Sequence, residues 1–235
     1  MPSLAVMQPY FLPYLGYWQL LHSVDRFVIY DDVNYIKGGW INRNRILIAG
    51  EAKHITVPLL GASSYKKIRE IELAPVAAWA DKMIRTVELN YRRTPYFHDV
   101  FPVLVDIILC PARNLADYLR HQLTILANYM NITTDIVLTS SVYKNHSLSG
   151  QDRVLDICRR EGATDYINAI GGKALYDGAR FSSFGVDLFF ISPELNSYNQ
   201  TVPGFIPGLS IMDLLMELGP AQVHDHLNAY RLIRA

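Results

Sequence analysis

Two polar segments near the amino end hold the residue types best suited to chemistry. The second of them, 31–45, gathers carboxylates, amides, phenols and cations within fifteen residues: Asp31, Asp32, Asn34, Tyr35, Lys37, Asn42, Arg43, Asn44 and Arg45. Gly38 and Gly39 in its middle permit close approach of backbone to a ligand. Because such groups cost free energy to bury without partners, their concentration favours a site for a charged ligand. The alternative is a solvated loop that binds no ligand and is held by ordinary ion pairs.

Each residue type in this segment suits a different task. Asp31 or Asp32 could orient an amine or a ribose hydroxyl, act as a base, or hold magnesium with phosphate oxygens. Lys37 and Arg43 could neutralise phosphate or carboxylate, and Asn42 or backbone amides could stabilise an oxyanion. We therefore predict catalytic roles for Asp31, Asp32, Lys37, Asn42 and Arg43. Neighbours on a strand face opposite sides, so which aspartate faces the site stays open.

The first polar segment, 8–19, supplies amides and phenols where the chain enters a helix. A helix amino terminus presents unpaired N–H groups that can hold a phosphate or carboxylate. The segment has no GxGxxG or GxxxxGK[ST] pattern. Its alternative role is an aromatic turn that caps the sheet. Together with later segments it yields the substrate-binding prediction Gln8, Tyr10, Tyr14, Gly16, Tyr17, Gly171, Gly172, Tyr176 and Gln200.

Those later segments carry weaker signals. Gly171 and Gly172 follow an apolar run and could bring backbone amides to a ligand at a helix start. Gln200 could add polar lining. Ser210 and Asp213 fit the first turn of a helix better than they fit catalysis.

Five apolar or β-branched runs must position these groups. They span 4–7, 26–30, 135–138, 165–170 and 187–191, and helical patterns at 14–22, 151–161 and 172–182 separate most of them. Helices between strands imply right-handed crossovers and a parallel sheet. The fold class is therefore α/β: a Rossmann-like, mostly parallel sheet flanked by helices. Polar residues at the ends of such strands lie where open α/β sheets bind ligands.

An insertion at about 46–130 separates the second and third runs. Its first part predicts a small antiparallel β-meander. Three helices follow, the first opened by Pro75 and ending near Asn90, the others at 95–109 and 115–130. No repeat or flexible linker divides the chain, so we expect 1–235 to form one domain.

The composition argues against several classes of protein and kinds of site. The 235 residues carry zero formal charge, and half are hydrophobic, which argues against wrapping of duplex nucleic acid and against disorder. The two cysteines and seven histidines show no disulfide, zinc-ligand, HExxH or GxSxG pattern, so we predict no metal site. No apolar run approaches the ~20 residues of a membrane span. We expect a cytoplasmic protein.

The chain resembles the WbqC-like family of bacterial proteins over nearly its whole length. The likeness rests on QPYFLPYLGYWQLL, FVIYDDVNYIKGGWINRNRI, TVPL, YINAIGGKALY, YNQ and LSIMDLL. The family's motif positions fall on Gln8, Pro9, Tyr10, Tyr14, Gly16, Tyr17, Asp31, Asp32, Lys37, Trp40, Asn42, Arg43, Gly171, Gly172 and Tyr176. The resemblance implies transfer of an amino acid, glycine, to an amino sugar during synthesis of O-antigen or another surface polysaccharide. It assigns no catalytic role to any residue.

Three hypotheses follow. The leading one is a transferase that places an aminoacyl group on the amine of a nucleotide-linked sugar, with an activated amino acid or ATP as co-substrate and no prosthetic group. The alternative is a non-catalytic protein that binds a nucleotide-sugar or glycan precursor. A third, recognition of a charged tRNA as acyl donor, rests on basic residues alone: Arg43, Arg45, Lys66, Lys67, Arg92 and Arg93. The sugar, the donor, the oligomeric state and the participation of a metal in the reaction stay open.

Overall fold

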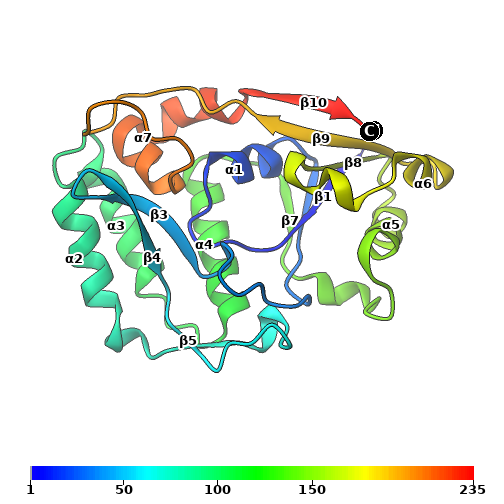
Figure 1. The fold of residues 1–235 in the computed structure, drawn as a ribbon, viewed down its shortest axis with the longest axis horizontal. Coiled ribbons are helices and arrows are strands. Elements are labelled where there is room, and N and C mark those ends of the chain that lie inside the picture. Colours follow the sequence, from blue (N-terminus) through cyan, green and yellow to red (C-terminus); the bar gives the residue numbers. More distant parts are fainter. Residues whose placement is uncertain (1) are drawn as a thin grey trace.

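The computed structural model describes residues 2–235 and contains a central six-stranded sheet in the order β10-β9-β8-β1-β2-β7 (Figure 1). Five strands run parallel, and β10 is antiparallel to β9. The α/β class with a mostly parallel sheet is thus confirmed. The strands are β1 Ser3–Met7, β2 Arg26–Ile29, β7 Asp135–Val137, β8 Asp165–Ala169, β9 Asp187–Pro193 and β10 Tyr230–Arg234.

Helices cover both faces of this sheet because its central strands are apolar on both sides. In β1, Ala5 packs into one buried cluster while Leu4 and Val6 pack into a second. Alternate side chains of a strand point to opposite faces, so the two clusters lie on opposite faces of the sheet. The first contains α1 Leu15–His22, α4 Leu115–Tyr129 and α7 Ile211–Leu227; the second contains α5 Gly150–Glu161 and α6 Gly178–Ser183.

The order of the strands places a switch point next to β1. From β1 the chain proceeds to β2 and β7 on one side, and it later returns to pair β8 on the other side of β1. In open α/β sheets, ligands bind in the crevice beyond the carboxyl ends of the strands at such a point. The residues that enter this crevice region are those after Met7, Ile29 and Ala169.

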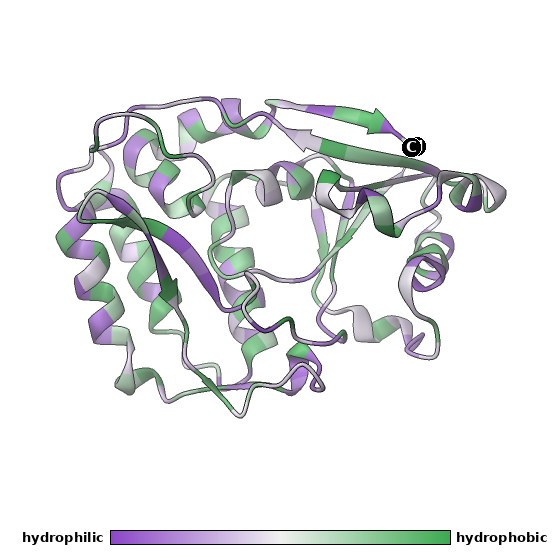
Figure 2. Cartoon of the chain, in the orientation of Figure 1, coloured by the Kyte–Doolittle hydropathy of each residue, from purple (hydrophilic) through white to green (hydrophobic). Residues whose placement is uncertain are grey.

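The insertion after β2 differs in detail from the expected meander. Its strands form two separate antiparallel pairs, β3 Arg43–Ile48 with β4 Glu51–Thr56, and β5 Leu59–Leu60 with β6 Glu72–Leu73. Three helices follow, α2 Ala80–Tyr91, α3 Phe97–Ile108 and α4, and they share the buried cluster of α1 and α7. Figure 2 shows the first half of β3 as hydrophilic and its second half as hydrophobic.

Two helix predictions are wrong. The stretch 172–182 is not one helix: a 3-10 helix, η4 Ile170–Leu175, precedes α6, whose amino end is capped by the Asp177 carboxylate accepting from the Ala179 N–H at 2.9 Å. Two glycines and an N-cap residue interrupt the pattern. Pro75 likewise precedes a 3-10 helix, η2 Val76–Ala78, and the α2 helix begins only at Ala80. The remaining short helices are η1 Ile68–Glu70 and η3 Ser140–Tyr143.

Strand β10 has no counterpart among the predicted strands. It lies at the sheet edge, and four of its five residues are exposed. An exposed edge strand with two arginines lacks both the alternation and the apolar run that reveal a strand in a sequence.

A sharp bend in α7 depends on Gly219. Its backbone is non-helical there (φ 72°, ψ 168°), a region nearly restricted to glycine. A Cβ at this position would lie 2.5 Å from Cε1 of Tyr96, whose own N–H donates to the Met216 carbonyl at 3.0 Å. The bend therefore lets α7 close against the start of α3.

We expect Gly219→Ala to lower the free energy of unfolding by about 1–3 kcal/mol from backbone strain alone, with a further loss from the clash with Tyr96. Urea denaturation measures the change. Gly162→Ala is the matched control, because Gly162 also has a positive φ (64°) but no atom of the described chain lies within 4 Å of its Cβ position. Equal losses in the two variants would show that the contact with Tyr96 is unimportant.

Candidate functional site

The two polar segments near the amino end meet in the structure. The Phe11 N–H donates to the Trp40 carbonyl at 3.0 Å. The Asn44 side-chain amide donates to the carbonyls of Phe11 (3.0 Å) and Leu12 (2.8 Å). Since Asn44 is buried at the start of β3, it fastens the loop after β1 to the insertion.

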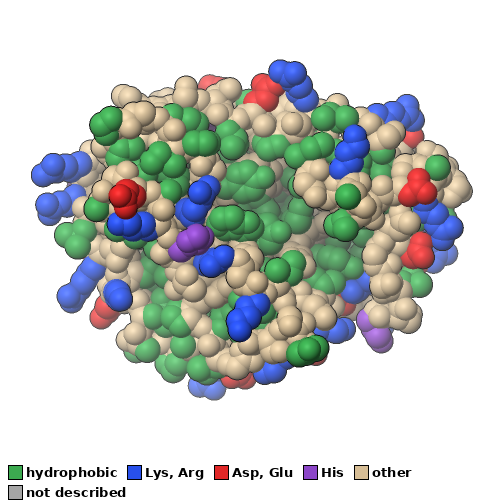
Figure 3. Space-filling model, viewed as in Figure 1, with side chains coloured by type: hydrophobic (Ala, Val, Ile, Leu, Met, Phe, Trp, Pro, Cys, Tyr) green, Lys and Arg blue, Asp and Glu red, His purple; other side chains and the backbone are tan. Residues whose placement is uncertain are grey.

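A cavity of about 230 Å³ lies where these segments meet. We call it the aromatic pocket; it is lined by Tyr10, Tyr14, Trp40, Asn44, Arg45 and Gly208. Figure 3 shows a hollow near the middle of this face of the molecule, floored by hydrophobic side chains. Lys or Arg side chains and a histidine lie beside it, whereas the acidic side chains of this face lie toward its periphery.

Asp32 is held by partners on both carboxylate oxygens. Its Oδ2 accepts from Nη2 of Arg153 at 2.5 Å, and its Oδ1 accepts from the Ser140 hydroxyl. The two charged side chains of this pair are only 7% and 5% exposed. Arg153 also donates to Asn145 at 2.9 Å, and its guanidinium lies 4.9 Å from the centroid of the Tyr30 ring. Asp32 therefore joins the end of β2 to α5.

Asp31 is held differently. Its Oδ1 accepts from the Thr139 hydroxyl (2.7 Å) and the Ser140 N–H (3.2 Å), both just beyond β7. No donor from residues 2–235 contacts its Oδ2. The side chain is fixed and nearly buried, with the residue 2% exposed. Within residues 2–235, Oδ2 of Asp31 thus keeps its hydrogen-bond capacity, at the carboxyl edge of the sheet.

The other predicted catalytic residues have distinct environments. Asn42 accepts from the Tyr35 hydroxyl at 2.7 Å and donates to the Val57 carbonyl at 2.9 Å. Arg43 donates from Nε to the Gly39 carbonyl at 3.1 Å and from Nη2 to the Gly38 carbonyl. Lys37 is exposed and forms no ion pair with any residue that the structure describes. Asn42 and Arg43 therefore shape the loop that carries Trp40.

The predicted residues of the first segment lie together around the start of α1. Tyr10 packs on Tyr17, with ring centroids 5.5 Å apart. Gly16 leaves room for the ring of Tyr14, which a Cβ would approach to 2.6 Å. Burial raises the pKa of the Tyr17 phenol well above its usual value, so this side chain is neutral. Gln8 is half-buried immediately after β1.

Gly171, Gly172 and Tyr176 follow β8, on the other side of the switch point from Gln8. In η4, Gly171 is exposed and Gly172 is half-buried. The half-buried Tyr176 packs on the rings of Tyr166 and Phe181, with both centroid distances 5.7 Å. These residues flank the crevice but are not among those that line the aromatic pocket.

Gln200 belongs to a buried hydrogen-bond cluster. Its amide donates to Oδ2 of Asp213 at 3.0 Å, and its carbonyl accepts from the Ile206 N–H at 2.8 Å. Asp213 also accepts from the hydroxyls of Tyr91 (2.8 Å) and Tyr198 (2.6 Å). Ser210 caps α7 as predicted, accepting from the Met212 N–H. This cluster fixes the loop before α7, which carries Gly208, against the insertion.

Glu217 adds a second carboxylate to this cluster, four residues after Asp213 on α7. Burial, and then repulsion from Asp213, raises the pKa of Glu217. A raised pKa in the folded state means that the folded protein binds this proton more readily than the unfolded chain does. The stability it contributes is therefore lost as the pH rises through the raised pKa.

Glu217→Gln should stabilise the protein at neutral pH. The glutamine keeps a carbonyl to accept from the Thr201 N–H, which lies 3.1 Å away in the native protein, and removes the charge facing Asp213. Relief of a like-charge pair at this helical spacing is worth about 0.2–0.5 kcal/mol. Urea denaturation should show this gain at pH 7 and none below the usual carboxyl pKa of about 4.3. An equal change at both pH values would contradict it.

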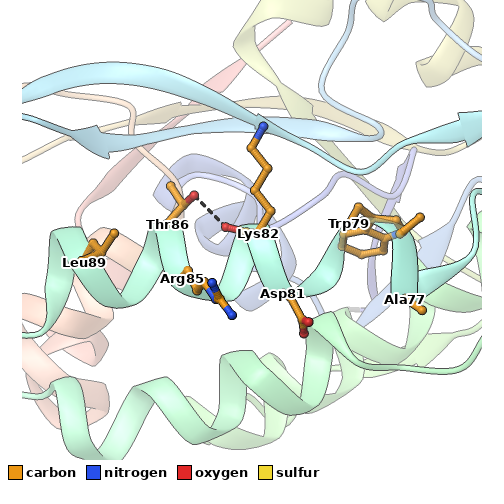
Figure 4. A pocket seen from close by; sticks show the side chains of 8 residues that line it. Ala77, Trp79, Asp81, Lys82, Arg85, Thr86 and Leu89 are labelled. Atoms are coloured by element: carbon orange, nitrogen blue, oxygen red, sulfur yellow. Dashed lines mark hydrogen bonds between the residues drawn. The ribbon is translucent and has the colours of Figure 1, made fainter.

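A larger hollow of about 440 Å³ runs along the outer side of α2. Figure 4 shows Lys82 pointing toward the β3–β4 hairpin and Asp81 and Arg85 pointing the other way. Thr86 donates its hydroxyl to the Lys82 carbonyl at 2.7 Å. The charged side chains here are all exposed, so nothing in this hollow converges on a ligand.

Two searches of the described part of the chain, for clusters of metal-binding side chains and for long apolar helices, give negative results. Residues 2–235 contain no group of three or more His, Cys, Asp or Glu side chains placed to bind a metal ion. Within the same range, no helix has the length and apolar character needed to cross a bilayer.

Comparison with known proteins supports the resemblance seen in the sequence. The model of the WbqC-like protein family matches residues 8–225. The chain belongs to the WbqC-like protein family. It is also 31% identical, over 235 residues, to Uncharacterized protein Rv1507c of Mycobacterium tuberculosis, a match covering 98% of this chain and 100% of the relative. No solved structure gives a significant match.

The structure also brings forward residues of this WbqC-like protein that were not among the predicted site residues. Trp40 and Arg45 line the aromatic pocket, and Arg153 neutralises Asp32. The alternation of Arg43, Asn44 and Arg45 on a strand indicates two arginines on one face and the amide on the other. No local pattern links Arg153 to an aspartate more than a hundred residues earlier.

Proposed function

We propose that this WbqC-like protein binds a nucleotide-linked amino sugar at the carboxyl edge of its sheet and transfers an aminoacyl group, glycyl in the first instance, to the sugar amine. The observation that carries the proposal is Oδ2 of Asp31, which accepts no hydrogen bond from residues 2–235. A nearly buried carboxylate with a free oxygen at the end of β2 is suited to accept a proton from an ammonium or hydroxyl group.

The reaction requires a neutral amine. In the proposed step, the neutral amine attacks the carbonyl carbon of the activated amino acid, and its nitrogen passes one proton to Asp31 Oδ2 as the bond forms. A C–N bond forms as the bond from that carbon to the leaving group breaks, and the leaving group departs with the electron pair. The fixed geometry of Asp31, held through Oδ1 by Thr139 and Ser140, orients Oδ2 toward the amine. Lys37, and the N–H groups of Arg43 not bonded within the loop, provide positive charge for phosphate.

Asp32 has a positioning role in this proposal. Because both of its oxygens are occupied, it maintains the loop after β2 rather than meeting the substrate. The predicted substrate residues Gln8, Tyr10, Tyr14, Gly171 and Gly172 would line the path of the ligand along the switch point.

Product analysis tests the proposal directly. The protein is incubated with a panel of nucleotide-linked amino sugars and with glycine donors: glycine plus ATP, a glycyl thioester and glycyl-tRNA. Mass spectrometry should detect a sugar nucleotide heavier by one glycyl residue, and no change in a matched sugar nucleotide that lacks the amine. Absence of product with every combination would refute the transferase.

A second function is favoured by a specific observation. Asn42, Arg43 and Asp32 direct their polar atoms into internal contacts, so few candidate catalytic groups are free, while the aromatic pocket is open. This suits a protein that binds the nucleotide sugar without reacting. Thermal shifts with the same panel, accompanied by no product, would assign this function instead.

A further inference from the structure

The aromatic pocket contains an arginine without an acidic partner. Among the described residues, the buried Nε of Arg45 finds no hydrogen-bond acceptor, and Nη2 reaches only the Gly208 carbonyl at 3.2 Å and the Pro207 carbonyl at 3.5 Å. No carboxylate among residues 2–235 lies within ion-pair distance of this side chain. A partly buried guanidinium that lacks a counter-charge favours an anionic ligand.

Its surroundings add positive charge rather than neutralise it. Arg43 lies two residues earlier on β3, on the same face as Arg45, and His54 on β4 is the cross-strand partner of Arg45. Burial and the two arginines lower the pKa of His54, as expected where cations gather. Phosphate bound by arginine forms charge-assisted and often bidentate hydrogen bonds, which are about twice as strong as neutral ones.

The remaining walls of the pocket are aromatic. The Trp40 ring is stacked on His54 with centroids 5.9 Å apart, and the Arg45 guanidinium lies 5.9 Å from the Trp40 centroid. Tyr10 and Tyr14 complete the lining. Aromatic side chains bind flat rings by stacking, and a nucleobase offers such a face.

The volume limits the occupant. Pockets for complete drug-sized ligands measure roughly 300–1,000 Å³, so a cavity of about 230 Å³ is too small for a whole nucleotide-linked sugar and accepts only one end of it. The rest of such a ligand must extend outside the pocket. Tyr10 and Tyr14 belong both to the pocket and to the loop after β1, so the switch-point crevice is the direction in which it extends.

We propose that the aromatic pocket binds the nucleoside phosphate end of the ligand, with the base against Trp40 and the phosphate on Arg45. This assignment rests on the proposed function in one respect, namely that the bound nucleotide carries a sugar. Binding of the nucleotide itself requires no turnover. A failed binding test and a failed transfer test are therefore distinguishable.

Tryptophan fluorescence provides the readout. Trp40 is 41% exposed, whereas Trp18 (0%) and Trp79 (7%) are buried, so a ligand in the pocket should perturb one of the three tryptophans. The probes are uridine and adenosine 5′-monophosphates, the two nucleosides, glucose 1-phosphate and inorganic phosphate. We expect at least one nucleoside monophosphate to change the fluorescence and to bind more tightly than its nucleoside, glucose 1-phosphate or phosphate alone.

Variants locate the site. Arg45→Met should weaken binding of the monophosphate by about tenfold to a hundredfold, the range for a hydrogen bond to a charged group, and bring it to the level of the nucleoside. Trp40→Phe should abolish the fluorescence change while calorimetry still detects binding. Arg85→Met, at an exposed arginine on α2, is the matched control and should leave both signals unchanged.

Three outcomes would overturn the proposal. One is that no monophosphate binds. Another is that Arg45→Met and Arg85→Met bind the monophosphate equally well. The third is that glucose 1-phosphate binds as tightly as the nucleotides, because the pocket would then hold the sugar end. Should Arg45→Met fail to fold, Arg45→Gln and Trp40→Phe provide the same comparisons.

Discussion

Asp31→Asn is expected to reduce the rate of aminoacyl transfer by about 10²–10⁴-fold, the contribution of a positioned general base. The asparagine can keep its carbonyl oxygen toward Thr139 and Ser140, which hold Oδ1 in the native protein, so the loop should stay in place. What is lost is the basic oxygen at Oδ2. The effect should therefore fall on kcat, with a smaller change in KM, because the sugar nucleotide is bound mainly by other groups.

Two comparisons make this prediction sharp. Asp81→Asn, at an exposed carboxylate on α2, is a matched control and should retain full activity. Thermal unfolding of Asp31→Asn checks that the fold persists. A folded Asp31→Asn variant with undiminished turnover would remove Asp31 from the mechanism, and the non-catalytic function would then gain support if the nucleotide still binds.

Arg153→Met is expected to lower the free energy of unfolding by about 3–5 kcal/mol, because it leaves the Asp32 carboxylate buried and uncompensated. The pair is nearly inaccessible to water, so solvent cannot replace the lost partner. The methionine fills much of the volume of the arginine stem, which separates loss of charge pairing from loss of packing. Urea denaturation of the native protein and the variant gives the difference.

A double-mutant cycle separates the effect of the charge pair on stability from the effect of side-chain packing. Asp32→Asn combined with Arg153→Met removes both charges, so most of the stability lost in Arg153→Met should return. Arg180→Met is the control, since the Arg180–Asp152 pair is about half exposed on both sides and should contribute less than about 1 kcal/mol. Equal losses at Arg153 and Arg180 would contradict the role assigned to the buried pair.

Much of the fold could be predicted from local patterns. The apolar runs at β1, β2, β8 and β9 and the amphipathic helices α4 and α5 carry strong signals, because each pattern follows the period of the element that buries it. The 3-10 helices and the exposed strand β10 carry weak signals, since neither has an apolar face of its own. The split of the meander into two pairs depends on contacts between segments, which no local pattern records.

The residues of the candidate site likewise fall into those that local patterns predict and those that they do not. Asp31, Tyr10 and Tyr14 could be proposed from residue type and from their place after strands, and the structure puts each at the carboxyl edge of the sheet. That both carboxylate oxygens of Asp32 accept hydrogen bonds, whereas only Oδ1 of Asp31 accepts them from the described residues, could not be predicted. The difference arises from Arg153 on α5 and from Thr139 and Ser140 beyond β7, all more than a hundred residues away along the chain.

By itself, the sequence determined the fold class, the family and the polar character of the two amino-terminal segments, because periodicity, turn residues and motif spacing are local properties. Only the tertiary structure decided which of these polar groups have free atoms. Hydrogen-bond capacity is consumed by whichever donors and acceptors the fold brings within about 3 Å, and for Asp31, Asp32 and Arg45 those neighbours come mainly from distant parts of the chain.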